Sequence, residues 1–222
     1  MYILGLDSAG NGASVALLRD GAVVSARVMS RPRGQAEILM PMIDEALREA
    51  RIEARSLDAI GVATGPGSFT GLRIAVAAAR GLALATGAPA IGVTRFAAVA
   101  AQFSGERRDG RALLVALDTR RDDFFLQLFA DRDGEPRLAG GDDAASTLPK
   151  IPLSLAGDAA YRLASFLSGR DIRVADEPER PLAEPVARLA AAAFRPGMAV
   201  APPRPLYLRP PDTTMPRRGT AQ

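Results

Sequence analysis

The 222-residue sequence predicts an α/β fold, a mixed sheet with helices on its faces. Apolar, β-rich segments and amphipathic helical segments follow one another in the order β-β-β-α-β-α-β-α over residues 2–103. An Asp-Gly dipeptide, a strong hairpin signal, joins the second and third β-rich segments. A second β-rich run begins after the polar stretch at 104–110. The chain is therefore expected to form two lobes.

The first strand is expected at 2–7, an apolar run that ends on an aspartate. Residues 12–29 then predict two antiparallel strands joined at Asp20 and Gly21, because Asp-Gly favours a two-residue hairpin turn. Two more buried strands are expected, at 58–65 and 88–93.

Three helices are expected between and after these strands. Residues 35–50 repeat apolar side chains at i, i+3, i+4 and i+7, which predicts an amphipathic helix with Pro41 near its first turns. Residues 71–87 carry Ala and Gly on nearly all faces, which favours close packing against another helix. The third helix, 94–103, starts at the N-cap residue Thr94.

The second half of the chain predicts fewer regular elements. Strands are expected at 112–118, 122–130 and 151–158, helices at 159–168 and 184–197, and a loop at 138–149. The predicted organisation is an N-terminal lobe (1–105), a C-terminal lobe (106–209) and a Pro-rich, disordered tail (210–222).

Two residue types are missing, and this excludes several kinds of chemistry. The chain has no cysteine and no histidine, so it has no disulfide, no thiolate nucleophile, no Ser-His triad and no Cys- or His-ligated zinc. Any reaction would have to use carboxylates, hydroxyls, arginine, backbone amides or a bound nucleotide.

The sequence also bears on localisation. No apolar run is long enough for a membrane span, and the N-terminal stretch MYILGLD has no basic leader, so we expect a cytoplasmic protein.

The formal charge of +3 comes almost entirely from arginine. Of the 28 basic residues one is lysine, Lys150, and the other 27 are arginines. They are scattered among 25 acidic residues, whereas a nucleic-acid surface needs a patch or a stripe. A compositional bias is the favoured interpretation, and a nucleic-acid-binding surface stays open as an alternative.

Residues 64–73, TGPGSFTGLR, join a strand to a helix by a glycine-rich turn. A Walker loop needs Gly-Lys-Ser/Thr, but Leu72 and Arg73 follow the last glycine here. A dinucleotide fingerprint has one residue fewer between its second and third glycines. Two interpretations remain: free helix amides hold an anion, or Ser68 or Thr70 caps a helix whose position matters for packing.

Two strands end on an aspartate that is followed by a hydroxyl residue, one in each lobe. These are Asp7 with Ser8, and Asp118 with Thr119. Pairs of such strand ends hold Mg-nucleotide in actin-like and sugar-kinase ATPases. Aspartate after a strand is also a common turn former, so the pattern alone does not decide.

Several motifs together resemble the TsaB (YeaZ) family, the bacterial subunit of the machinery that installs threonylcarbamoyladenosine in tRNA. They are YILGLDSAGNGASVALLRDG, AEILMPMIDEAL, GPGSFTGLRIA, ALDTRRDDFF and PLYLR, in the family's order. The resemblance covers roughly residues 1–209 and is densest over 1–95, and GPGSFTGLR is its most specific element. Two departures are Gln35, near which relatives often carry a histidine, and Thr119, where the family usually has alanine.

The resemblance implies an actin-like (ASKHA) fold with a reduced second lobe and a non-catalytic role. In the family the two amphipathic helices pack against the same helices of the transferase subunit TsaD, or form a homodimer in its absence, and the ATPase TsaE joins the pair. The chain would then reach tRNA only through the complex, without contacting a membrane. No cofactor would be required, although residual ATP or ADP binding at Asp7, Ser8 and Asp118 stays open.

The partner interface is expected on the exposed sides of the two helices and on the glycine-rich turn. Its predicted residues are Ile38, Leu39, Met42, Ile43, Leu47, Gly65, Pro66, Gly67, Ser68, Phe69, Thr70, Gly71, Leu72, Arg73, Ala75, Val76 and Ala79. The main rival is a small ASKHA-type ATPase or kinase that uses Asp7 and Asp118 around Mg-ATP.

Overall fold

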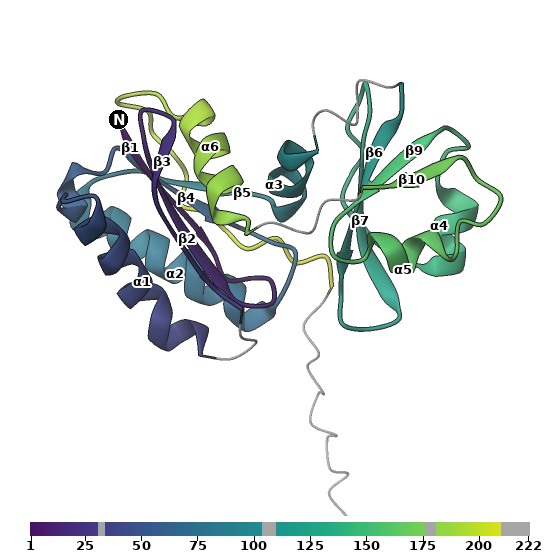
Figure 1. The fold of residues 1–222 in the computed structure, drawn as a ribbon, viewed down its shortest axis with the longest axis horizontal. Helices are drawn as coiled ribbons and strands as arrows, with labels where there is room; N and C mark the ends of the chain where they lie inside the picture. Colours follow the sequence, from purple (N-terminus) through teal and green to yellow (C-terminus); the bar gives the residue numbers. More distant parts are fainter. Residues whose placement is uncertain (31–33, 104–109, 176–180, 210–222) are drawn as a thin grey trace, which may run out of the picture.

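The computed structural model describes residues 1–30, 34–103, 110–175 and 181–209, and it has two lobes, each built on a five-stranded sheet (Figure 1). The predicted disordered tail, 210–222, and residues 104–109 of the polar stretch at 104–110 lie outside the described residues. The first sheet has the order β3-β2-β1-β4-β5 and the second β10-β9-β6-β7-β8.

The first sheet confirms the strands expected in the N-terminal half. Its strands are β1 (Tyr2–Asp7), β2 (Ala13–Arg19), β3 (Ala22–Met29), β4 (Ala59–Ala63) and β5 (Ala90–Val93). β1 pairs antiparallel with β2 and parallel with β4. The hairpin turn takes positive φ at Asp20 (51°) and Gly21 (84°), as the Asp-Gly signal predicts.

Helices cover both faces of this sheet. α1 (Gln35–Glu49) and α2 (Phe69–Thr86) lie side by side on one face, and α6 (Ala183–Ala193) lies on the other (Figure 1). Side chains along β1 point alternately to the two faces of the sheet. Leu4 and Leu6 pack in the core under α1 and α2, whereas Ile3 packs in the core under α6.

A close approach of α6 requires a glycine in β1. A Cβ atom built at Gly5 would lie 2.0 Å from the carbonyl oxygen of Ala183 and 2.8 Å from the Cβ of Ala187. Both distances are shorter than real contacts, so any side chain at this position would push α6 off the sheet.

The second sheet departs from the sequence prediction at its edges. Its strands are β6 (Ala112–Asp118), β7 (Asp123–Phe129), β8 (Arg137–Gly140), β9 (Leu153–Ala156) and β10 (Ile172–Val174), and its helices are α4 (Gly141–Thr147) and α5 (Ala160–Ala164). The loop predicted at 138–149 is therefore wrong, since β8 and α4 lie there, and β10 was not predicted. These elements are three to seven residues long, too short for periodicity to reveal.

The predicted lobe boundary also needs a correction. α6 belongs by sequence to the predicted C-terminal lobe, yet it packs on β1 and β4 of the first sheet. The segment 203–209, called here the interlobe segment, then returns along the first lobe: the Leu206 N–H donates to the Thr64 carbonyl at 2.7 Å. The chain thus crosses to the second lobe and comes back. α3 (Arg95–Gln102) lies between the two lobes (Figure 1).

Candidate functional site

Most of the helix side chains predicted to face a partner lie instead in the core of the first lobe. Eight of them are at most 8% exposed: Leu39, Met42, Ile43, Leu47, Leu72, Ala75, Val76 and Ala79. Ile38 is half-buried against the same core. The prediction that these residues form the exposed sides is therefore wrong, because an apolar stripe at helical spacing marks the face that packs on the sheet.

The opposite face of α2 nevertheless exposes large apolar side chains. Leu84 is 90% exposed and Phe69 is 42% exposed. Between them this face carries the small exposed residues Ala77 and Gly81 and two exposed arginines, Arg73 and Arg80. The Arg73 guanidinium lies over the Phe69 ring, and Arg80 donates to the Pro203 carbonyl. Ile74, Ala78 and Leu82, at the border of the face, are half-buried against the core. We call this surface, from Phe69 to Ala85, the outer α2 face.

By length and composition alone, α2 would pass as a membrane span, with a mean hydropathy of 1.2. It is the only such helix in the described part of the chain, and 28% of it is buried inside the protein. Its inner side packs in the core of the first lobe through Ala75, Val76 and Ala79, a constraint that a membrane span does not have.

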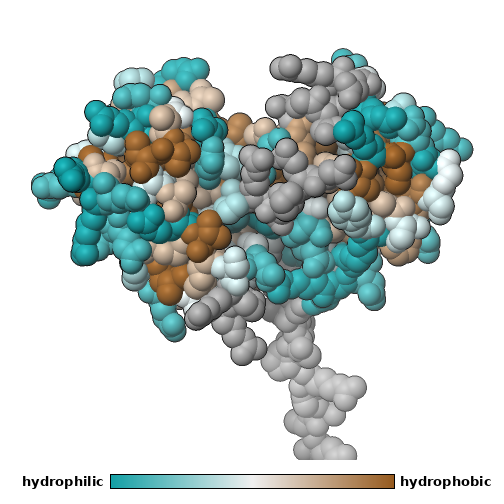
Figure 2. All heavy atoms as spheres, in the orientation of Figure 1, coloured by the Kyte–Doolittle hydropathy of each residue, from teal (hydrophilic) through white to brown (hydrophobic). Residues whose placement is uncertain are grey.

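The outer face of α1 changes character along the helix. Near its start it is apolar, with Met40 46% exposed and Pro41 beside it. Near its end it is charged: Asp44 and Arg48 pair at 2.6 Å, and Glu49 pairs with Arg27 of β3 at 2.8 Å. Figure 2 shows apolar side chains gathered in patches over the lobe that carries α1 and α2.

The glycine-rich turn packs its backbone directly against the loop after β1. The Ser68 N–H donates to the Ala9 carbonyl at 2.8 Å, and a Cβ atom at Gly71 would lie 1.9 Å from the carbonyl oxygen of Ser8. The Ser68 hydroxyl accepts from the Gly71 N–H and caps α2, as the sequence suggests. Packing thus accounts for the glycine at this close approach, and the turn fixes where α2 begins.

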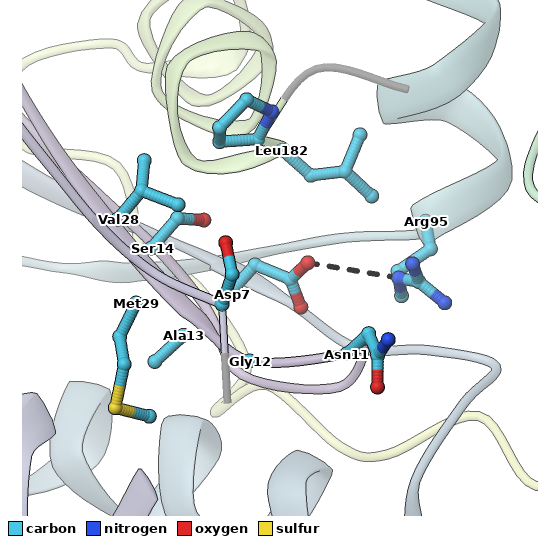
Figure 3. A pocket seen from close by; sticks show the side chains of 12 residues that line it. Asp7, Asn11, Gly12, Ala13, Ser14, Val28, Met29, Arg95 and Leu182 are labelled. Carbon is cyan, nitrogen blue, oxygen red and sulfur yellow. Dashed lines mark ion pairs between the residues drawn. The ribbon is translucent and has the colours of Figure 1, made fainter. Parts of the chain in front are cut away.

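Asp7 ends β1 and is held by an arginine that the sequence did not single out. The Asp7 carboxylate lies 3.6 Å from Nε of Arg95, the first residue of α3, and both side chains are buried (Figure 3). Asp7 also accepts from the Ala9 N–H at 2.9 Å. Ser8 is fully buried, and its hydroxyl donates to the Gly71 carbonyl at 2.7 Å, so this hydroxyl is not exposed to a ligand.

Asp118 ends β6 in an equivalent way. Its Oδ1 accepts from Nη2 of Arg162 at 2.8 Å and from the Arg120 N–H at 3.0 Å. Arg162 itself lies over the Phe124 ring, 4.2 Å from its centroid. A magnesium ion at either strand end would therefore compete with a guanidinium already in contact with the carboxylate.

A cleft of about 940 Å³ separates these two strand ends. The interlobe segment forms part of its wall, and the Tyr207 ring of this segment lies against the Phe69 ring, tilted by 36° with 5.3 Å between centroids. In the residues that the structure describes, no three carboxylates gather in a way that suits a metal ion. The cleft thus lies between the two strand ends, where the Mg-ATP site was predicted. The carboxylates of Asp7 and Asp118 are, however, already paired with arginines.

The interlobe segment ends in a charge pair with the second lobe. Arg209 contacts the carboxylate of Asp123, at the start of β7. Burial raises the pKa of Asp123, but hydrogen bonds from Arg209 and Thr119 outweigh burial, so the pKa lies below the ordinary value. The Arg120 guanidinium adds a second bridge between the lobes by donating to the Asn11 side chain at 3.0 Å.

The sequence offered little sign of these arginines. Arg95 follows an N-cap threonine and is predicted only as a helix residue, and Arg162 lies in an ordinary helical stretch. Their roles depend on α3 and α5 facing strand ends that are 88 and 44 residues away in sequence. An arginine inside an otherwise Ala-rich apolar helix, such as Arg95, is the one signal that was available.

Comparison with known proteins gives consistent matches. The family described as "TsaD: tRNA N6-adenosine threonylcarbamoyltransferase" matches residues 30–148, more than half of the chain. The Escherichia coli tRNA threonylcarbamoyladenosine biosynthesis protein TsaB is 32% identical over 151 residues, 68% of this chain and 64% of that protein. The chain thus matches slightly less than two thirds of the E. coli protein's length.

Solved structures point to the same family. YeaZ from Pseudomonas aeruginosa has a TM-score of 0.74 at 30% identity, covering 93% of this chain and 99% of that one. A ROK hexokinase from Thermus thermophilus has a TM-score of 0.50 at 16% identity, covering 85% and 98%, which shows a shared fold only. The predicted actin-like, two-lobed fold is confirmed, and the chain belongs to the TsaB (YeaZ) family.

Proposed function

We propose that this chain is a non-catalytic subunit of the tRNA threonylcarbamoyladenosine-forming machinery, and that it works by binding a TsaD-like transferase subunit. Family membership supports the pathway, since the E. coli relative is named for threonylcarbamoyladenosine biosynthesis. The absence of histidine and cysteine supports a role outside the chemistry itself. The chain would act in the cytoplasm and reach tRNA through the complex.

The observation that carries the proposal is the outer α2 face. A helix whose inner side is already in the core normally presents polar residues to water. Here Leu84 is 90% exposed, with the exposed small residues Ala77, Gly81 and Ala85 near it. The two arginines of this face bond within the protein: Arg73 donates to the Tyr207 hydroxyl and Arg80 to the Pro203 carbonyl. Small side chains let a second helix come close, and burying Leu84 in that contact would contribute about 1.5–3 kcal/mol.

A TsaD-like subunit is the partner whose chemistry fits best. The TsaD family matches residues 30–148 of this chain, a range that includes both α1 and α2. A partner with a related helix pair offers a related apolar face, so the two pairs form a pseudo-symmetric bundle. A second copy of the chain would occupy the same face when that subunit is missing, and a TsaE-like ATPase would join the assembled pair.

The experiment is co-expression with the TsaD-like subunit, followed by size-exclusion chromatography with mass measurement. Wild type should elute as a complex. Leu84→Glu should weaken the complex by at least tenfold while leaving the thermal unfolding midpoint within about 2 °C, because a fully exposed side chain contributes little to the monomer.

The matched control is Tyr161→Glu, which places the same charge at an exposed apolar residue (70% exposed) on α5 of the second lobe. This variant should bind like wild type. Equal elution of wild type, Leu84→Glu and Tyr161→Glu as intact complex would refute the proposed interface. A wild-type chain that stays separate from the co-expressed subunit would refute the partner.

A further inference from the structure

We propose that Asn11 is a deamidation site, and that Arg120 of the second lobe promotes the reaction at its side-chain amide. The product carries a carboxylate in place of the amide, so the contact between the lobes gains a negative charge. This inference goes beyond the proposed function and does not depend on the partner subunit.

Asn11 is the only asparagine in the 222-residue sequence, and a glycine follows it. The two residues lie on the loop between β1 and β2 (Figure 3), and Asn11 is exposed to water. A glycine has no side chain to shield its backbone nitrogen, so an asparagine before glycine loses its amide more readily than one before a larger residue. Any asparagine deamidation in this chain therefore occurs at one position.

The reaction needs no reagent other than water. The Gly12 nitrogen attacks Cγ of Asn11, a new N–Cγ bond forms, and an electron pair moves onto Oδ1. The Gly12 N–H proton passes to water, the Cγ–Nδ2 bond breaks, and the amide nitrogen takes up a proton and leaves as ammonia. Water then opens the cyclic succinimide at one of its carbonyl groups, which gives aspartate or isoaspartate.

Arg120 lies where negative charge develops during this reaction. Its Nη2 donates to Oδ1 of Asn11 at 3.0 Å, and Oδ1 is the atom that becomes negative when the ring closes. A guanidinium at this atom stabilises the charged intermediate, as hydrogen-bond donors do in an oxyanion hole. Because a guanidinium has no acceptor, it also keeps the oxygen of the amide, rather than its nitrogen, toward Arg120.

The β6–β7 turn holds Arg120 in this place. Its backbone φ is 61°, a left-handed conformation that is unusual for a residue with a side chain. Its N–H donates to the Asp118 carboxylate at 3.0 Å, which fixes the turn. The donor is therefore in position before the reaction begins, and the turn does not have to reorganise.

The attacking nitrogen is also available, which distinguishes this site from the two Asp-Gly pairs in the described residues. Among the hydrogen bonds that these residues form outside helices and strands, none has the Gly12 N–H as its donor. The Gly134 N–H, in contrast, donates to the Leu128 carbonyl at 2.8 Å. The hydrogen bond from the N-terminal ammonium holds the pKa of Asp20 below its ordinary value, so this side chain is an ionised carboxylate, which resists attack.

The product changes the contact between the lobes. Before the reaction, Arg120 donates to a neutral amide. Afterwards, aspartate at position 11 places a carboxylate beside the same guanidinium, and a hydrogen bond between charged groups is the stronger one. Because the pair is exposed, we expect a small stabilisation that salt removes.

The test is incubation of the folded full chain at mildly alkaline pH, followed by peptide mass spectrometry. Position 11 should deamidate, and Arg120→Gly, which keeps the left-handed turn, should slow the reaction by at least about threefold. Arg121→Ala, at the next arginine of the turn, should leave the rate unchanged. Asn11→Gln, which keeps an amide on a longer side chain, should give no product in the same period.

The same rates in urea separate the effect of the fold from that of the local sequence. In the denatured chain Arg120 is no longer held at Asn11, so wild type and Arg120→Gly should deamidate at the same rate. The proposal would be overturned by an Asn11 that stays intact in the folded chain, by equal rates of folded wild type and Arg120→Gly, by equal slowing in Arg121→Ala, or by a difference that persists in urea.

The charge of the product is tested with Asn11→Asp. At low salt this variant should raise the thermal unfolding midpoint by about 1–2 °C, and the rise should vanish in the Arg120→Gly background. An equal change in both backgrounds would mean that the new carboxylate does not act through Arg120, and would overturn this part of the proposal.

Discussion

The two lobes have the same strand plan but different helices. In each lobe a central strand, β1 or β6, pairs antiparallel with the next strand and parallel with a later one. The first lobe places α1 and α2, 15 and 18 residues long, on one face of its sheet. The second lobe has α4 and α5, of 7 and 5 residues. Only the first lobe therefore has a long helix pair with a second face to offer.

The lobes also use their strand ends alike. Asp7 and Asp118 each end the central strand, and each pairs with an arginine from a nearby helix. The Asp7 pair is buried, whereas about 40% of both Asp118 and Arg162 is exposed. Both lobes therefore have an Asp–Arg ion pair at the end of the central strand. The buried pair, Asp7 with Arg95, lies in the first lobe, next to the glycine-rich turn that fixes where α2 begins.

The largest expected effect comes from placing a charge on the inner side of α2. Ala79 has no exposed surface, so Ala79→Arg buries an unpaired guanidinium and overfills the core under α2. We expect a loss of about 3–5 kcal/mol in the free energy of unfolding, measured by urea denaturation. If the variant unfolds like wild type and only partner binding is lost, the inner and outer faces of α2 have been assigned the wrong way round.

The next effect comes from the close contact between α6 and the first sheet. Gly5→Ala should lower the free energy of unfolding by about 2–3 kcal/mol, because its Cβ would collide with the Ala183 carbonyl. Gly140→Ala, at the end of β8 with nothing within 4 Å, is the matched control in the second lobe and should change it by less than about 0.5 kcal/mol. Equal losses would contradict the packing difference.

The link between the lobes should depend on pH in the acid range. The pKa of Asp123 is lower in the folded chain than its ordinary value of 3.8, so its ionised form stabilises the fold. This stabilisation is fully present above pH 4 to 5 and is lost as pH falls through the folded pKa. The stability difference between wild type and Asp123→Asn, measured by urea denaturation, should therefore shrink below about pH 4. A difference that grows as pH falls would have the wrong sign.

The smallest effect is expected on the charged end of α1. Arg48 and Asp44 form an i,i+4 pair with side chains 76% and 55% exposed. Arg48→Ala should lower the free energy of unfolding by no more than about 0.5 kcal/mol, and salt should remove that difference. A loss above 1 kcal/mol would mean that this part of α1 is less exposed than described.

The sequence predicted most elements of the first lobe but not which helix face is free. Periodicity places Leu39 and Ile43 on one stripe of α1, and burial then assigns that stripe to the sheet. Leu84 lies in an apolar helix without strong periodicity, so its exposure depends on where the sheet and α1 lie. Pattern alone identifies an amphipathic helix, and only the tertiary packing shows which apolar side chains remain outside.

The second lobe and the cleft were harder for a different reason. The strand β8 and the helix α4 are too short to show a period, and α4 is polar at its start, with Asp142 and Asp143. The pairing of Asp7 with Arg95 joins segments that are distant in sequence, so no local pattern encodes it. Short elements and long-range ion pairs are the parts of this fold that one sequence cannot specify.

The most direct measurement is site-specific photo-crosslinking within the complex. A benzophenone side chain is placed at position 84 on α2 or, as the comparison, at position 161 on α5, and the chain is co-expressed with the TsaD-like subunit. The account predicts a crosslink to that subunit from position 84 and none from position 161. A crosslink from position 161 alone, or from neither position in an intact complex, would contradict it.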